Sequence, residues 1–339
     1  MIIVRALICL LSLVTLPAFA RLELVWPTPN PAFFEGRPIE AYIQPTVSGD
    51  PSSGLFGCVR SNGYQFHEGL DLKPVEARRH GEPTDEIFAA MDGVVRHISG
   101  RAGESSYGRY IVLEHPNATP AIYTLYAHLQ SLAPGLQVGD EVRAGQVIAV
   151  MGHTAGGYAI PRERAHLHFE MGLMVTTDFQ NWYNHQRFGS PNEHGPWNGM
   201  NLMGFDPREG SERRRSHPNE DFIDYLHSLP VALKVRVATP HTPDFAIRYP
   251  TLVTGTLPAG SLLAGWEIEC WWTGLPLSLR PLDATEMGVQ RPGTMQIVAL
   301  NREELVTHRA IGLLRGRGTG SLPAKDLRDV LEKLFGPLR

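Results

Sequence analysis

The sequence lacks several features that would place it in common protein classes. Its longest run of basic residues is the arginine triplet at 213–215, and its formal net charge is −4. A phosphate-binding surface needs a broad basic stripe, so nucleic acid is not an expected partner. There is no internal repeat, and the glycine-rich stretch at 315–321 matches neither a dinucleotide-binding nor a P-loop pattern. Beyond the N-terminus, no apolar run is long enough to span a membrane.

The N-terminal residues 1–20 have the three-part pattern of a secretory signal peptide. Arg5 precedes a short apolar run at 6–16, and Ala18-Phe19-Ala20 forms a small-x-small cleavage site. A membrane anchor is the alternative, but the short run and the cleavage site favour removal of the leader after Ala20. We therefore expect a secreted or periplasmic protein with no stable membrane span after cleavage.

Few cysteines remain once this leader is removed. Of the 3 cysteines in the sequence, Cys58 and Cys270 belong to the mature chain. In an oxidising compartment these two could form one disulfide that joins the two halves of the chain. Two buried thiols are the alternative, and the sequence does not give the distance between them that would decide.

Turn-forming residues are abundant, in contrast to the scarce lysines. The 34 glycines and 27 prolines favour a turn-rich, mainly β protein, and 339 residues suggest two domains. After the signal peptide at 1–20 we expect an extended N-terminal segment at 21–51, a domain of short strands at 52–207, and an α+β domain at 215–339.

Local patterns predict individual elements. Apolar residues recur at helical spacing in 219–229 and 325–335, which predicts two helices. Residues 174–200 have no clear period and predict a long loop. Trp26, Phe33 and Phe34 are expected to anchor the extended N-terminal segment. The clearest strands are expected at 93–99, 109–116, 121–129, 147–152, 165–172, 233–239 and 266–272.

The stretch FHEGLDL at 66–72 places a histidine and an aspartate four residues apart. Alternate side chains of an extended strand share a face, so His67 and Asp71 are expected on one side and the two leucines on the core side. Gly69 lies between the two polar residues, where a glycine leaves space for a ligand to approach.

Two further stretches show the same alternation with histidines. In AHLHFEM, His166, His168 and Glu170 share one face, and the apolar residues share the other. In TLYAHL, His128 is expected on the same face as the preceding threonine and tyrosine. Three strands thus each present a histidine on a polar face that is backed by an apolar face.

These residue types suit a metal site. Neutral imidazoles and a carboxylate are the ligand set of zinc in hydrolytic sites, and three ligands leave a position for a water whose pKa zinc lowers to about 7. Four ligands would instead make a closed structural site, and the spacing alone does not say whether His166 is a ligand. A third interpretation also stays open at this point, in which these histidines are exposed and bind no metal. The other histidines of this region are expected at the surface: His80, His97, His115, His153, His185 and His194.

Taken together and in this order, FHEGLDL, YTLYAHL, VGDEVRAGQVIAVMG and AHLHFE resemble the M23 family of zinc metallopeptidases, the lysostaphin-type peptidoglycan endopeptidases. FGCVR and DGVV fit the same pattern, and the resemblance covers about residues 52–207. The resemblance implies an antiparallel β-sheet core of the M23 peptidase type. With the helical and strand patterns after residue 215, the expected fold class is mainly β with a smaller α+β C-terminal region.

The resemblance also implies a role for each polar residue. His67, Asp71 and His168 would hold a Zn2+ cofactor. His128 and His166 would be the catalytic histidines, which flank the metal-bound water, move protons and stabilise the tetrahedral intermediate.

Some residues depart from the family pattern or match it poorly. The link at 153–165 is longer than usual, which puts the shape of the groove in doubt.

Two further residues have expected roles beside the metal ligands and the catalytic histidines. Glu170 is expected to orient a histidine. An aromatic hydroxyl often lies near the oxyanion in this family, but Tyr64 matches that place poorly and is expected to be structural.

The implied activity is that of a secreted zinc metalloendopeptidase that hydrolyses peptide cross-links of bacterial peptidoglycan. A catalytically silent module that binds the cell wall or regulates other wall hydrolases is the alternative. Such relatives typically lack one or more of the polar residues, and all of them are present here. The expected partner is a peptidoglycan peptide. The scissile bond, the oligomeric state, the role of 215–339 and a latent form closed by 174–200 stay open.

Overall fold

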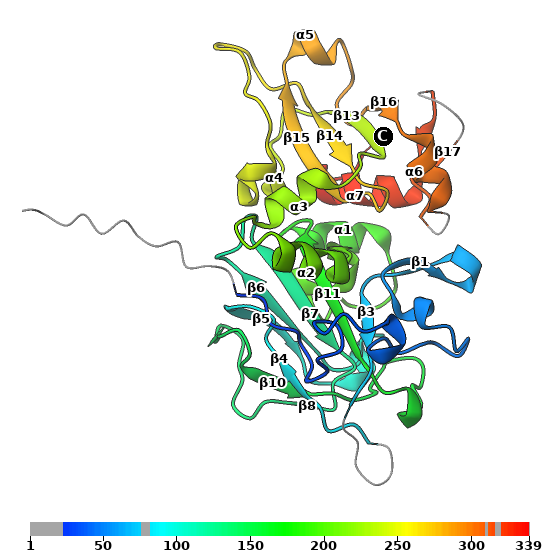
Figure 1. Ribbon diagram of the computed structural model, residues 1–339. Helices are drawn as coiled ribbons and strands as arrows, with labels where there is room; N and C mark the ends of the chain where they lie inside the picture. Colours follow the sequence, from blue (N-terminus) through cyan, green and yellow to red (C-terminus); the bar gives the residue numbers. More distant parts are fainter. Residues whose placement is uncertain (1–22, 76–81, 309–310, 316–319, 339) are drawn as a thin grey trace, which may run out of the picture.

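The computed structural model describes residues 23–75, 82–308, 311–315 and 320–338 (Figure 1). The expected signal peptide at 1–20 and His80 lie outside these residues. Among the described residues, every helix is too short or too polar to cross a membrane.

The chain between residues 57 and 205 forms antiparallel sheets (Figure 1). The largest follows the order β12-β11-β7-β6-β5-β9, with β3 paired to β11. A smaller sheet has the order β4-β10-β8, and β1 pairs with β2 alone. The mainly β fold with an antiparallel core is therefore confirmed. The strands are β1 (Gly57–Arg60), β2 (Gln65–His67), β3 (Leu70–Leu72), β4 (Glu86–Phe88), β5 (Gly93–Ser99), β6 (Tyr110–His115), β7 (Ile122–Ala127), β8 (Ser131–Leu132), β9 (Glu141–Val142), β10 (Val147–Val150), β11 (Leu167–Met174) and β12 (Leu202–Phe205).

Apolar residues pack on both sides of the large sheet because alternate side chains of its strands face opposite ways. On β11, Phe169 and Met171 pack into the main core. On β7, Leu125 and Ala127 belong to a separate, smaller cluster. The register pairs His168 with Ala127, and directly paired residues point to the same side of a sheet. His168 therefore lies on the side of the smaller cluster.

The C-terminal part of the chain contains a four-stranded antiparallel sheet with the order β15-β14-β13-β16. Figure 1 shows α1, α2, α3 and α7 between this sheet and the large one. The main core runs through both parts of the chain. Helix α2 spans the expected domain boundary near 207–215. The division of the chain into domains therefore stays a prediction. The elements are α1 (Phe179–Gln186), α2 (Pro207–Ser216), α3 (Phe222–Ser228), β13 (Leu233–Ala238), α4 (Asp244–Arg248), β14 (Gly265–Cys270), β15 (Pro276–Leu282), α5 (Ala284–Met287), β16 (Met295–Leu300), α6 (Arg302–Thr307), β17 (Leu314–Arg315), β18 (Leu322–Pro323) and α7 (Lys325–Phe335).

The long loop expected at 174–200 is wrong in part, because this segment contains α1. Phe179, Trp182 and Tyr183 lie at helical spacing and pack together in a cluster of their own. Such an apolar stripe favours a helix. Because polar residues surround the three aromatic ones, the helical spacing is difficult to recognise in the sequence.

The N-terminal segment is held by aromatic residues, largely as expected. The rings of Trp26 and Phe33 stack at 4.2 Å, and both are buried in the main core. Phe34 contacts them but is 38% exposed. Among the described residues no disulfide joins Cys58 to Cys270, and burial raises the pKa of the Cys270 thiol to about 12.

Candidate metal and catalytic site

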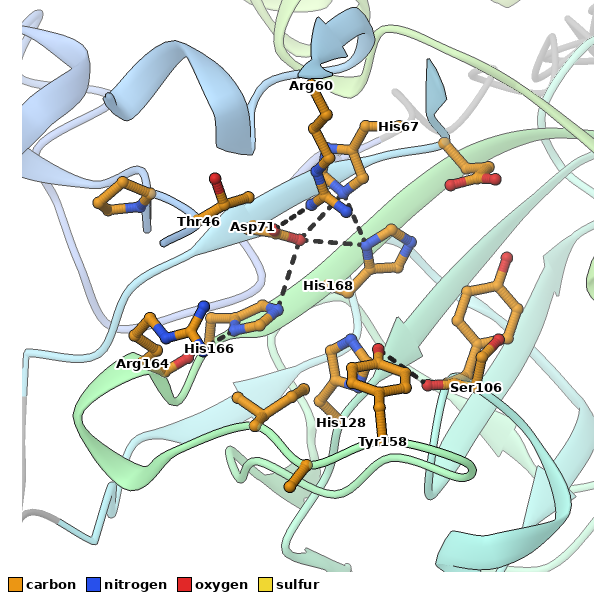
Figure 2. A pocket seen from close by; sticks show the side chains of 15 residues that line it. Thr46, Arg60, His67, Asp71, Ser106, His128, Tyr158, Arg164, His166 and His168 are labelled. Atoms are coloured by element: carbon orange, nitrogen blue, oxygen red, sulfur yellow. Dashed lines mark hydrogen bonds and ion pairs between the residues drawn. The ribbon is translucent and has the colours of Figure 1, made fainter. Parts of the chain in front are cut away.

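His67, Asp71 and His168 meet in a pocket of about 230 Å³ (Figure 2). His67 Nε2 lies 3.0 Å from Asp71 Oδ1 and 3.0 Å from His168 Nδ1, and Asp71 Oδ1 lies 3.2 Å from His168 Nδ1. Zinc binds imidazole nitrogen at about 2.0–2.1 Å in tetrahedral geometry, which places neighbouring ligand atoms roughly 3.3 Å apart. The three atoms therefore fit the ligand shell of an ion of this size.

Strand pairing brings Asp71 to His168. Strand β3 pairs with β11 in the register Asp71 opposite His168, so both side chains leave the sheet on the same side. Leu70 and Leu72 are fully buried in the main core, as the alternation predicted.

The single strand predicted through 66–72 is wrong, because β2 ends at His67 and β3 begins at Leu70. Gly69 in the break also has another role than expected. A Cβ added there would lie 2.3 Å from the carbonyl oxygen of Phe169, so the glycine allows β11 to approach closely. It does not open space for a ligand.

His128 and His166 line the same pocket (Figure 2). Their ring centroids are 4.8 Å apart, and His166 Nε2 lies 3.5 Å from Asp71 Oδ1. The prediction that His128 shares a strand face with Tyr126 is wrong. Tyr126 packs into the main core, on the side of the sheet opposite to His168. His128 reaches the pocket through a left-handed backbone conformation, with φ of 61°, directly after β7. Alternation along a strand does not foresee such a turn.

The pocket histidines have fixed orientations because the ring nitrogen that faces away from the pocket has an acceptor. A carbonyl oxygen only accepts hydrogen bonds, so the nitrogen bound to it carries the proton and the neutral ring keeps a bare Nε2. Three of the rings thus turn a lone pair towards the pocket. The contacts are His67 Nδ1 with Leu55 O at 2.7 Å, His128 Nδ1 with Thr154 O at 2.8 Å, and His166 Nδ1 with Arg164 O at 2.7 Å.

His168 is oriented by Glu170, as predicted. Its Nε2 donates to Glu170 Oε1 at 2.9 Å, which leaves Nδ1 facing the pocket. Glu170 is buried and accepts two further hydrogen bonds, from the hydroxyls of Tyr107 at 2.5 Å and Tyr123 at 2.9 Å. Such partners fix the ring and increase its basicity as a ligand. Neither tyrosine was predicted from the sequence to belong to the site.

Arg60 is a further contact that the sequence did not reveal, although FGCVR contains it. Its Nη2 lies 2.5 Å from Asp71 Oδ2, and its Nε donates to Ser53 O at 3.0 Å. The guanidinium thus occupies one carboxylate oxygen of Asp71 and leaves Oδ1 to the histidines. Arginine suits this task because its planar fork holds a carboxylate in a defined orientation.

Burial and neighbouring charges shift the pKa values of the site. Burial raises the pKa of Asp71, but His67, His166 and a hydrogen bond from His168 outweigh it and hold this pKa well below its usual range. Burial lowers the pKa of His128 and of His166, which favours neutral rings able to accept a proton.

The pKa of His168 moves in the opposite direction. Burial lowers it, but the hydrogen bonds to Asp71 and Glu170 outweigh burial and raise it to about 10. A metal ion that binds Nδ1 would displace the proton from this nitrogen.

Two tyrosines that the sequence reasoning missed line the pocket. Tyr107 lies beside His168, and the Tyr158 hydroxyl donates to Ser106 O at 3.2 Å (Figure 2). Tyr158 belongs to the link at 153–165. The unusual length of this link was the sequence feature that could have indicated an additional pocket residue. Tyr64 is 66% exposed and is not among the residues that line this pocket.

The surface position predicted for His115 is wrong, and so is that for His194. His115 is fully buried, with Nδ1 donating to Asp92 O at 2.9 Å and Nε2 2.7 Å from Thr124 Oγ1. His194 is 8% exposed and contacts His97. Both are buried polar residues with hydrogen-bond partners.

Comparison with known proteins identifies the part of the chain that carries this site. Residues 65–180 match the model of peptidase family M23. The sequence has no match among the curated proteins.

Several solved structures are similar to this chain. A protein of Ruminococcus gnavus ATCC 29149, assigned as a glycyl-glycine endopeptidase LytM, is 28% identical over 32% of this chain and 39% of its own, with a TM-score of 0.25. A zinc-containing peptidase of Vibrio cholerae is 28% identical over 31% of this chain and 26% of its own, with a TM-score of 0.24. The catalytic domain of lysostaphin from Staphylococcus simulans is 26% identical over 35% of this chain and 74% of its own, with a TM-score of 0.25.

The chain thus spans well under half the length of the Ruminococcus and Vibrio proteins. The TM-scores are below 0.5, so the resemblance rests on the family match and not on these superpositions. The matched segment contains His67, Asp71, His128, His166 and His168. The resemblance predicted from the sequence is confirmed over this segment, because residues 65–180 match the model of peptidase family M23.

Proposed function

We propose that this protein is a zinc metalloendopeptidase that hydrolyses peptide cross-links of bacterial peptidoglycan. The observation that carries the proposal is the convergence of His67, Asp71 and His168, with their ligand atoms 3.0 to 3.2 Å apart in an open pocket. The family match and the names of similar structures, among them lysostaphin, support the substrate class. The signal-peptide pattern at 1–20 supports export to the periplasm or the medium, where such a substrate lies.

The three proposed ligands leave a coordination position for water and substrate, as in catalytic rather than structural zinc sites. A zinc ion bound there would polarise the scissile carbonyl and make a nucleophilic water available near neutral pH. His67 and His168 are held for this by Leu55 O and Glu170, and Asp71 is held by Arg60.

His128 and His166 are the proposed proton-transfer residues. Both present a bare Nε2 to the pocket, and their lowered pKa keeps the rings unprotonated at neutral pH, as a proton acceptor must be before it reacts. One imidazole takes the proton of the attacking water while the water oxygen bonds to the carbonyl carbon. The proton then passes to the amine nitrogen as the C–N bond breaks. A histidine that is protonated during this step stabilises the developing oxyanion.

The test is digestion of purified sacculi by residues 21–339, with zinc content measured by metal analysis and products by mass spectrometry. The matched variants are His166→Ala and, as a control far from the pocket, His227→Ala at an exposed position of α3. The proposal expects cross-linked dimers to become monomers with the wild type and with His227→Ala, and not with His166→Ala. The mass of the products then names the scissile bond.

Zinc-loaded wild type that releases no wall fragments would contradict the proposed activity. Binding to sacculi under the same conditions would then favour the catalytically silent module.

A further inference from the structure

A short segment at 55–67, here called the site ribbon, supports two of the three proposed ligands. Strands β1 and β2 of this ribbon pair only with each other among the described strands and are not part of the large sheet. The ribbon supplies Leu55 O to His67 Nδ1, and it carries Arg60, whose guanidinium contacts Asp71. The ribbon therefore contributes to the orientation of both His67 and Asp71.

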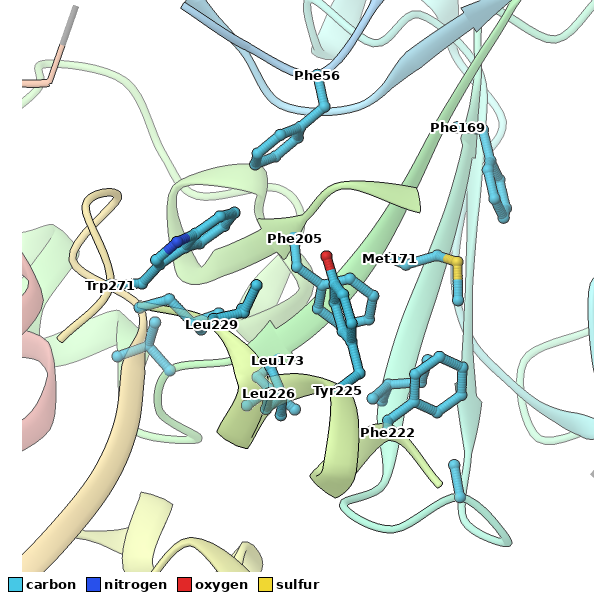
Figure 3. Packing of buried hydrophobic residues seen from close by; sticks show 14 of the residues in the cluster. Phe56, Phe169, Met171, Leu173, Phe205, Phe222, Tyr225, Leu226, Leu229 and Trp271 are labelled. Atoms are coloured by element: carbon cyan, nitrogen blue, oxygen red, sulfur yellow. The ribbon is translucent and has the colours of Figure 1, made fainter. Parts of the chain in front are cut away.

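Two tryptophans of the C-terminal region cover the ribbon. The ring of Trp271 stacks on Phe56, with centroids 5.8 Å apart and planes within 3°, and Figure 3 shows the two rings facing each other. The ring of Trp272 meets Phe66 edge to face at 5.7 Å. It also packs where Gly57 has no side chain, since a Cβ there would lie 3.8 Å from Trp272 Cη2.

These tryptophans are held firmly on their own side. They follow β14 in a tight turn, in which Trp271 N donates to Leu275 O at 2.9 Å and Gly274 N donates to Trp271 O at 2.9 Å. The ring of His308 stacks on Trp272, with centroids 3.9 Å apart and planes within 6°. Trp271 is 5% and Trp272 is 4% exposed. The turn therefore offers a rigid surface to the ribbon.

We propose that Trp271 and Trp272 form a clamp on the site ribbon and thereby set the geometry of the metal site. The C-terminal region would then be part of the working site, although none of its described residues lines the pocket. The two tryptophans act as positioning residues through Phe56, Phe66 and the backbone of the ribbon. The inference rests on the proposed function for its link to catalysis, whereas its link to metal binding does not require that function.

The magnitude of the effect follows from how sensitive such sites are to orientation. Loss of a residue that orients a metal ligand typically lowers metal affinity 10- to 100-fold. A displacement of about 1 Å at a catalytic group can reduce the rate by roughly 100-fold. Removing the Trp272 ring leaves Phe66 and Gly57 without their neighbour, so the ribbon can shift towards the space that the ring occupied.

The test uses the full mature chain with Trp272→Leu, Trp272→Phe and the matched control Trp266→Leu. Trp266 is equally buried at 4%, but it lies within β14 and its Nε1 donates to His241 O. Among the described residues, the tryptophan rings that pack on Phe56 and Phe66 are those of Trp271 and Trp272. Zinc affinity is measured by competition with a chelator, and site geometry by the visible absorption of the cobalt(II)-loaded protein. We expect Trp272→Leu to lower zinc affinity about 10-fold and to change the cobalt spectrum.

Trp272→Phe should restore most of the affinity, because an aromatic ring remains beside Phe66. Trp266→Leu should lower the melting temperature without a change in affinity or spectrum. If Trp272→Leu does not fold, Phe66→Leu removes the same contact from the ribbon side and is read by the same two measurements. Unchanged zinc affinity and an unchanged cobalt spectrum in the folded variant would overturn the clamp.

The two proposals fail in different ways. Wild type that binds zinc but cuts no wall peptide contradicts the proposed function, and the affinity and spectrum still decide on the clamp. Wild type that cuts the wall, with variants that have wild-type affinity and spectrum, contradicts the clamp alone.

Discussion

Two antiparallel sheets of this molecule carry polar residues at alternate positions, and they use these residues differently. On the C-terminal sheet, the polar side chains pair across strands with opposite charge. Lys234 lies 2.5 Å from Glu269, and Arg236 lies 2.7 Å from Glu267. Each charge has a complementary neighbour, which is typical of a sheet face that meets solvent.

On the large sheet, the alternate residues of β11 do not form separate pairs. His168 and Glu170 are nearly buried, and the imidazoles of His67, His166 and His168 gather around the single carboxylate of Asp71. Several lone pairs point to one place, where a cation would satisfy them all. Polar residues at alternate positions of a strand therefore indicate a functional face where their side chains converge on one point. They indicate a structural face where they form separate pairs of opposite charge.

The largest expected effect is the loss of the convergence itself. His67→Ala removes one of the three ligand atoms, so we expect the variant to purify without stoichiometric zinc and to leave sacculi undigested. Metal analysis and product mass spectrometry measure the two losses. Arg236→Ala is the matched change on the paired face and should keep both zinc and activity. Equal zinc content in the two variants would sink the assignment of His67.

His166→Ala separates binding of the metal from chemistry. The variant should retain zinc, while kcat for a wall peptide falls by roughly 100- to 10,000-fold, because a proton-transfer residue is lost. Steady-state kinetics measures kcat and KM separately, and KM should change much less than kcat. A variant that loses its zinc would instead make His166 a ligand.

His115 tests burial without convergence, since it lies on the large sheet but outside the pocket. Burial lowers its pKa to about 4, whereas the unfolded chain has a value near 6.5. Below pH 6.5 the unfolded state binds more protons, so the free energy of unfolding decreases as the pH falls from 6.5 to 4, by up to about 3 kcal/mol.

The measurement is denaturant unfolding at several pH values for the wild type and His115→Gln. The difference in pH dependence between the two isolates this histidine from other acid-titrating groups. Identical slopes between pH 6.5 and 4 would show that His115 is not held in its neutral form.

Glu170→Gln weakens the convergent site without removing a ligand. An amide oxygen can still accept from His168 Nε2, but the negative charge that increases the basicity of the ring is lost. We expect zinc affinity to fall about 10-fold with little change in the melting temperature of the zinc-free protein. Chelator competition measures the affinity. Wild-type affinity in this variant would mean that the hydrogen bond alone orients the ring.

The smallest effect is expected on the paired face. Glu267 contacts both Arg236 and Arg280 near the surface, and Glu267→Gln should cost less than about 1 kcal/mol of unfolding free energy. Chemical denaturation measures this cost, and zinc affinity should stay that of the wild type. A cost of several kcal/mol would show that this face is more than a set of solvated pairs.

The sequence was sufficient where the relevant interactions are local. Alternation in AHLHFEM correctly placed His168 and Glu170 on one side of β11 and Phe169 and Met171 on the other. Apolar spacing predicted α7 at 325–335 with the bounds that the structure has. Both results follow because neighbouring residues decide the periodicity of a strand or a helix.

Tertiary structure decided the features in which the local pattern was silent or misleading. The left-handed conformation of His128 turned its ring to the pocket, against the alternation of β7. The break at Gly69 follows from the close approach of β11, which only strand pairing produces.

By itself, then, the sequence determined which residues could act as metal ligands and which strands carry them, because chemistry and periodicity are properties of short segments. Only the tertiary structure decided what supports those ligands. The partners of Asp71 and His67 within 55–67, and the tryptophans that cover this segment, come from residues about 10 to 200 positions apart. Such contacts depend on how whole elements pack, and no local pattern specifies them.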